Sequence, residues 1–288
     1  MPSPPQFRLR RRFRNNEQAK AGSKLETVQR DWGDLASMVT RLIYDTQSKR
    51  IGPLLRGHLL LYERRDAPTY AAWSGVLLLL IVLVLEFLIG PRMESLAALD
   101  LQLPSSALRT LILLALALVL VRLVARVRLN DVGFISFGQW RAAETLYLAQ
   151  ALLIGCGLFV FMFGARLGLS GGAGAWLAVG GHVLTQMLWG LYQEVVYRGL
   201  LQTELSRRFG AIAGALAANL AFTFGPLHLY HLQNSTDTAQ TTIMMAAIFG
   251  IGLLFAFIFA RCRNIWLIGL LHGLGNVFGN VGSLAASG

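Results

Sequence analysis

Long uninterrupted apolar runs constrain this chain more than any other feature. The run 73–90 (WSGVLLLLIVLVLEFLIG) carries a single charge, that of Glu86. A membrane-spanning helix needs about 20 predominantly apolar residues, so this run with its flank is long enough to cross a bilayer. The composition agrees, because only 14% of the 288 residues are charged, against roughly 25% in an average soluble domain. We therefore predict an integral membrane protein.

Similar runs recur along the chain at helical length, so the predicted fold is all-α. We expect a polytopic transmembrane helical bundle of about seven membrane helices, which forms a domain over residues 69–288. A basic N-terminal region, residues 1–68, precedes this domain. The predicted membrane helices span residues 71–90, 107–124, 142–167, 176–205, 211–230, 241–260 and 265–281.

The basic residues predict the orientation of this bundle. Of the 26 Lys and Arg residues, 14 precede the first apolar run. With the N-terminus inside, the cytoplasmic side holds 22 of them and the outer side holds 3. This asymmetry is typical of cytoplasmic loops and places the N-terminus in the cytoplasm. We expect a multi-pass protein of the inner (plasma) membrane that does not bind nucleic acid, although its net charge is +11.

The basic N-terminal region is expected to contact anionic lipid at the bilayer surface. Between residues 25 and 50, apolar residues recur at helical spacing, with Trp32 and Leu35 on the same stripe. This pattern predicts either an amphipathic helix at the interface or a cytoplasmic helix packed on the loops.

Three groups of polar side chains lie inside the predicted membrane helices. An ionisable group at mid-membrane depth costs several kcal/mol, with scales that begin at about 2.5 kcal/mol, so such groups indicate a function. Along the chain they are Gln193, Glu194 and Arg198, then His228, and then His272 and Asn276.

Each group also has a purely structural interpretation when taken alone. Glu194 and Arg198 share a helix face at i and i+4 and could simply join two helices. His228 could be a packing residue, and His272 with Asn276 could make interhelical hydrogen bonds. Together, however, the groups supply a base for water and donors for an oxyanion, which are the requirements of peptide hydrolysis.

The ordered set resembles the CAAX-protease and bacteriocin-processing family of intramembrane endopeptidases, also called the abortive-infection family. Its motifs are Glu-Glu-x-x-x-Arg, Phe-x-x-x-His and His-x-x-x-Asn, in that order. This chain has Gln193-Glu194-x-x-x-Arg198, Phe224-x-x-x-His228 and His272-x-x-x-Asn276. The resemblance covers a protease-like core at about 142–281, and it implies a peptide or protein substrate at the membrane and a role in proteolysis.

The resemblance also implies a role for each motif residue. A glutamate of the first motif and His228 would activate water, while His272 and Asn276 would steady the oxyanion and Arg198 would hold Glu194. The chain departs from the family at Gln193, because a carboxamide does not accept a proton at neutral pH. Three interpretations follow: Glu194 is the base, or His228 is the base while Gln193 positions water, or the protein binds peptides without hydrolysing them.

Other functions fit parts of the pattern. No cofactor is expected, although Glu194, His228 and His272 could form an open three-ligand zinc site. A transporter would also bury charged groups, but it predicts a hydropathy repeat that this sequence does not show. A non-catalytic immunity or assembly protein of the membrane is a further alternative. We expect hydrolysis.

Overall fold

The computed structural model describes residues 44–45, 50–51, 67–90, 105–165, 167, 172–226, 228 and 237–281. The chain divides into two units, residues 1–59 and 60–288. In the first unit, strands β1 (Tyr44–Asp45) and β2 (Arg50–Ile51) pair in antiparallel register. The helix predicted at 25–50 lies outside the described residues except for this end, where strands take its place. The polar run 45–50 (DTQSKR) lacks the apolar spacing of a helix face, so the prediction is wrong there.

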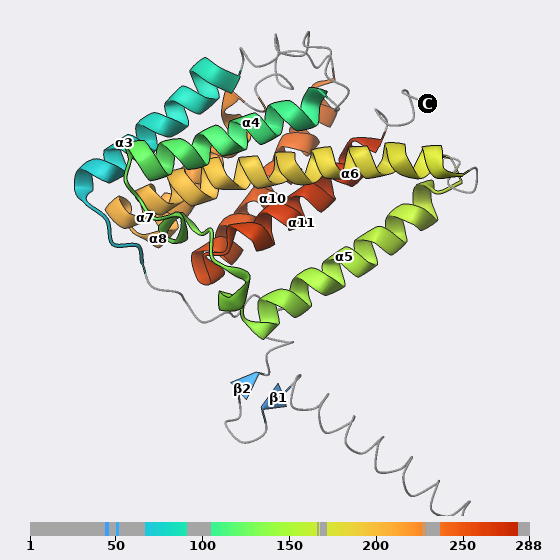
Figure 1. Ribbon diagram of the computed structural model, residues 1–288, viewed down its shortest axis with the longest axis horizontal. Helices are drawn as coiled ribbons and strands as arrows, with labels where there is room; N and C mark the ends of the chain where they lie inside the picture. The colour runs from blue at the N-terminus through green and yellow to red at the C-terminus, as the bar shows by residue number, and fades with distance from the viewer. Residues whose placement is uncertain are drawn as a thin grey trace, which may run out of the picture. The chain divides into compact units, whose positions relative to one another are not determined.

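Every regular element described in the second unit is a helix (Figure 1), as the all-α prediction requires. Three of the helices widen into π-helical turns, at Val84–Ile89, Leu120–Val124 and Val195–Gln202. Two short 3-10 helices, Leu129–Val132 and Phe137–Gln139, lie between α4 and α5. The α-helices are α3 (Ala72–Leu83), α4 (Ser105–Val119), α5 (Ala142–Phe163), α6 (Ala173–Glu194), α7 (Thr203–Phe209), α8 (Ala211–Phe224), α10 (Thr238–Cys262) and α11 (Ile265–Gly279).

Four helical segments of the described chain are long and apolar enough to cross a membrane, judged by length and composition. They are Ala72–Ile89, Ser106–Val124, Ala142–Phe163 and Thr238–Cys262. Helices α8 and α11 are shorter and also apolar. The structure thus agrees with a helical membrane protein, and a helix overlaps each of the seven ranges that we predicted. The number of membrane crossings stays a prediction.

The ends of two helices differ from the predicted boundaries. Helix α8 ends at Phe224 and does not continue to residue 230, because Gly225 is extended and Pro226 lacks the N–H that a helix needs. Helix α6 continues without interruption through the π-helical turns and α7 to Phe209, beyond the predicted end at 205. It ends at Gly210, whose φ of +86° no longer fits a helix.

Helix α11 packs along α6, and α8 packs between α10 and the continuation of α6. The α6–α11 contact is close because both helices carry glycine where they meet. A side chain placed at Gly190 would lie 2.7 Å from the Cα of Gly273 and 2.8 Å from the carbonyl oxygen of Gly269. Small residues of this kind allow helix backbones to touch in a membrane. In Figure 1, α5 diverges from α6, and its outward side chains are exposed, Phe161 by 86%.

Candidate functional site

The first polar group lies where α6 widens into its π-helical turns. Gln193 and Glu194 occupy the last turn of α6, and Arg198 lies in the π-helical segment that follows. All residues from 190 to 200 are buried. Turns of this type are rare and occur frequently at functional sites, because they redirect side chains within a helix. The helix therefore carries a carboxylate and a guanidinium into the interior of the bundle.

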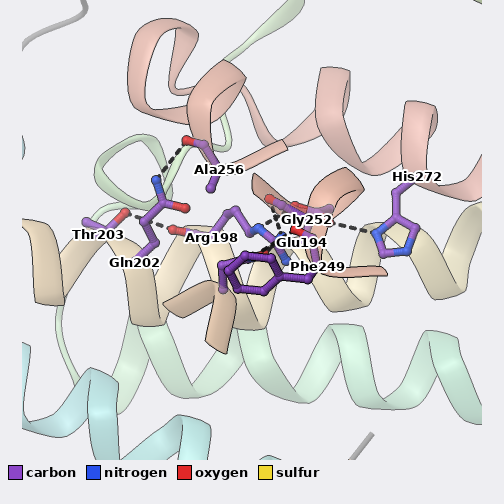
Figure 2. A network of polar contacts seen from close by, with 9 residues as sticks. Glu194, Arg198, Gln202, Thr203, Phe249, Gly252, Ala256 and His272 are labelled. Atoms are coloured by element: carbon purple, nitrogen blue, oxygen red, sulfur yellow. Dashed lines mark hydrogen bonds and ion pairs between the residues drawn. The ribbon is translucent and has the colours of Figure 1, made fainter. Parts of the chain in front are cut away.

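The carboxylate of Glu194 is held from two sides (Figure 2). Its Oε1 lies 2.7 Å from Nδ1 of His272 on α11, and its Oε2 lies 3.3 Å from Nε of Arg198. Glu194 and Arg198 are fully buried, and His272 is 9% exposed. A carboxylate only accepts hydrogen bonds, so Nδ1 of His272 donates. The contact sets the orientation of the imidazole and assigns its Nδ1 proton.

Arg198 links the continuation of α6 to α8 and α10. Its Nη2 donates to the carbonyl oxygen of Gly252 at 2.8 Å and to Oδ1 of Asn219 at 3.2 Å. Asn219 in turn donates from Nδ2 to the carbonyl oxygen of Phe249 at 3.0 Å. The guanidinium carbon lies 4.4 Å from the centre of the Phe222 ring, which is cation–π geometry. This buried cation is thus fixed by contacts to three helices.

Amide pairs continue the polar contact between α6 and α11. Gln193 Oε1 lies 3.5 Å from Nδ2 of Asn276, which donates to it. Further along the same pair of helices, Asn280 Nδ2 donates to Oε1 of Gln186 at 3.3 Å. The structure therefore brings Gln193 and Glu194 to the polar face of α11, and their partners there are Asn276 and His272, respectively.

His228 returns towards the bundle after the break in α8. Its backbone N–H donates to the carbonyl oxygen of Gly225 at 3.2 Å, and its Nδ1 lies 2.8 Å from the carbonyl oxygen of Phe222. The carbonyl only accepts, so Nδ1 of His228 carries a proton, and Nε2 of the neutral ring has the lone pair. The break at Gly225 and Pro226 thus places His228 at the level of Phe222, although it follows that residue by six positions.

Phe222 is the aromatic residue that joins the two histidines, a contact that the motif spacing did not indicate. Its ring centre lies 4.8 Å from that of His228 and 5.7 Å from that of His272, edge to face in both cases. The phenylalanine of the expected motif, Phe224, is instead 51% exposed.

Asn219 was not predicted from the sequence either. The helical spacing of Asn219 and Phe222 on α8, three residues apart, is the one signal that places both on the Arg198 face.

The zinc alternative named Glu194, His228 and His272 as ligands, and metal dependence stays a prediction. Within the described ranges, no three or more His, Cys, Asp or Glu residues are arranged to hold a metal ion. Glu194 and His272 are in direct contact, whereas the contact of His228 described above is to a backbone carbonyl. The arrangement thus consists of a carboxylate–imidazole pair, a second imidazole, and amide donors.

Comparison with known proteins bears on this arrangement. Residues 175–278 match the family model described as Type II CAAX prenyl endopeptidase Rce1-like. No curated protein and no solved structure matches the chain. The matched segment extends from α6 into α11 and contains all three polar groups. The resemblance to the CAAX-protease family is therefore confirmed over the part of the chain that holds the Glu194–His272 pair.

Proposed function

We propose that this protein is an intramembrane endopeptidase of the CAAX-protease type, which hydrolyses a peptide bond of a substrate held at the membrane. The observation that carries the proposal is the buried Glu194–His272 pair, 2.7 Å apart, in the segment that matches the family model. A membrane protein does not need such a pair for stability, because apolar residues of similar volume often serve as well. Its presence favours a chemical function.

His228 is the base that activates water in this proposal. Its Nδ1 donates a hydrogen bond to a backbone carbonyl, so the lone pair of the neutral ring is on Nε2. Nε2 takes the proton of a water molecule as the water oxygen attacks the scissile carbonyl carbon. Glu194 instead orients other groups, because its Oε1 accepts from Nδ1 of His272 and its Oε2 contacts Arg198. Of the alternatives for the missing motif glutamate, the proposal therefore takes His228 as the base and Glu194 as the residue that orients His272.

The oxyanion that forms on the substrate needs hydrogen-bond donors. Nδ2 of Asn276 is one, and Nε2 of His272 is another when that ring is protonated. Glu194 orients His272, and Arg198 holds Glu194. The tetrahedral intermediate collapses when His228 returns its proton to the leaving nitrogen, which breaks the C–N bond. Gln193 positions the attacking water in this scheme, since its amide neither takes up nor releases a proton.

A cleavage assay in membranes tests the proposal, with a farnesylated peptide that ends in a CAAX sequence as the probe. Removing a general base typically lowers the rate by about 10²–10⁴-fold, and removing an oxyanion donor by about 10²–10³-fold. We expect His228→Ala and Asn276→Ala to lose activity on these scales. Gln193→Glu restores the carboxylate of the family motif and is expected to raise turnover.

Half-buried His182 provides no suitable control because it contacts α11. Phe224→Leu, at a half-exposed position, is the control variant. Wild-type rates in His228→Ala and His272→Ala would refute the proposed mechanism. Binding of the probe without cleavage, by both the wild type and Gln193→Glu, would instead identify a peptide-binding relative that does not hydrolyse.

A further inference from the structure

Another buried carboxylate lies in the π-helical turns that continue helix α3, outside the segment that matches the family model. Glu86 is in the π-helical turns Val84–Ile89 and is 6% exposed. The hydroxyl of Tyr197 donates to its Oε2 at 2.7 Å, and the hydroxyl of Tyr192 donates to its Oε1 at 3.2 Å. The two tyrosines lie on either side of the Gln193-Glu194 pair in sequence. Glu86 is therefore joined directly to the helix that carries the site.

The cluster is costly for a purely structural contact. Burial removes a carboxyl group and two hydroxyls from water, which costs desolvation free energy. Three apolar side chains in the same place would not carry this cost. Most other buried residues of α3 and its π-helical turns are apolar, with Leu78 and Leu85 fully buried, while Ser74 is also buried. Glu86 is the one buried ionisable residue described on this helix, and its two hydroxyl partners indicate that the position of a partner, rather than stability, depends on it.

Tyr197 is the partner that reaches the site. Its ring packs edge to face on Phe222, with 5.3 Å between the centres. Its hydroxyl also borders the break in α8, because a Cβ at Gly225 would lie 3.5 Å from the hydroxyl oxygen. Phe222 and Gly225 are the residues whose carbonyl oxygens contact His228. Tyr192 differs in this respect, since its ring stacks on Trp189 at 5.5 Å.

We propose that Glu86 is a positioning residue of this site. It fixes the hydroxyl of Tyr197, and Tyr197 then holds Phe222 and the turn at Gly225 in the arrangement that places His228. The expected effect of Glu86 on catalysis rests on the proposed function. Its effect on the position of His228 does not. It extends the site to α3, a helix for which neither the motifs nor the family match provides a residue.

The test compares four variants of the full-length protein in the farnesylated-peptide assay. Misplacing a catalytic group by about 1 Å can cost roughly 10²-fold, so we expect Glu86→Ala and Tyr197→Phe to lower kcat by about 10–100-fold while KM changes little. Glu86→Gln keeps an acceptor for Tyr197 and a donor for Tyr192, and should stay within about 3-fold of wild type. Tyr192→Phe is the matched control, because it removes the other hydrogen bond to Glu86 without touching Phe222.

A second measurement separates this inference from the proposed function. The ¹⁵N ring signals of His228, assigned by comparison with His228→Ala, should shift in Tyr197→Phe and not in Tyr192→Phe, whether or not the probe is cleaved. A shift together with an inactive wild type would sustain the positioning role and refute the peptidase. Unchanged His228 signals in Tyr197→Phe, or equal effects of the two tyrosine variants on signals and kcat, would overturn the positioning role.

Discussion

Replacing Arg198 by methionine tests whether the buried charges of this site depend on one another. The substitution keeps an unbranched side chain but removes the ion pair to Glu194 and the hydrogen bonds to Gly252 and Asn219. Glu194 is then a fully buried carboxylate without a cation. Breaking a buried pair in this way costs about 3–5 kcal/mol. At roughly 2–4 °C per kcal/mol for a chain of this size class, the midpoint of thermal unfolding should fall by about 6–20 °C.

The chain contains a reporter for this measurement. Cys262 is fully buried, whereas Cys156 is exposed, so a thiol-reactive dye detects unfolding through Cys262 once Cys156→Ala has been introduced. Labelling is followed in detergent micelles during a temperature ramp, with the Cys156→Ala protein as reference. Because Cys262 lies on α10, which receives the Arg198 hydrogen bond at Gly252, the reporter is on a helix that the substitution affects.

The double variant Glu194→Gln/Arg198→Met is the control that isolates the charge. A glutamine at 194 still offers an oxygen to Nδ1 of His272, but the uncompensated negative charge is gone. We expect this variant to regain more than half of the loss in midpoint, as buried pairs replaced together often cost little. The reasoning fails if Arg198→Met alone shifts the midpoint by less than about 2 °C, or if the double variant unfolds at the same temperature as the single one.

Two further predictions concern packing. Gly190→Ala should lower the free energy of unfolding by at least about 1–3 kcal/mol and reduce the amount of folded protein, because its methyl group would meet the backbone of Gly273. Thermal unfolding measures this loss, with Gly180→Ala as the control, because nothing lies within 4 Å of a Cβ there. Phe222→Leu should lower peptide cleavage far more than Phe224→Leu, since the ring of Phe222 packs on both histidines. Equal cleavage by these two variants would argue against an aromatic contact in the site.

The helices could be predicted from the sequence because lipid leaves few alternatives for an apolar run of this length. The polar groups could be predicted for the same reason: Glu194 and His272 stand out against apolar neighbours, and the structure brings these two into contact. The i and i+4 spacing of Glu194 and Arg198 likewise predicted a shared face, and their ion pair is 3.3 Å long.

Contacts between helices could not be predicted in the same way. Phe222 is one of many aromatic residues in an apolar chain, and no periodicity distinguishes it from Phe224 until α8 is placed beside the continuation of α6. Pro226 indicated a break in the backbone near the end of α8, but the apolar pattern did not show that the helix stops at the extended Gly225. Glu86 was visible as a lone charge, but its partners are more than 100 residues away, at Tyr192 and Tyr197.

The glycine contact between α6 and α11 limits how a substrate reaches this site. At Gly190 and Gly273 main chain meets main chain, so no rotamer change widens the gap between the two helices. The spacing of the two backbones that carry Glu194 and His272 is consequently fixed by this contact, and the two helices are expected to move as one rigid body. Under the proposed function, the scissile bond is expected to approach the imidazole from another flank, where Phe222 of α8 and Phe255 of α10 border it.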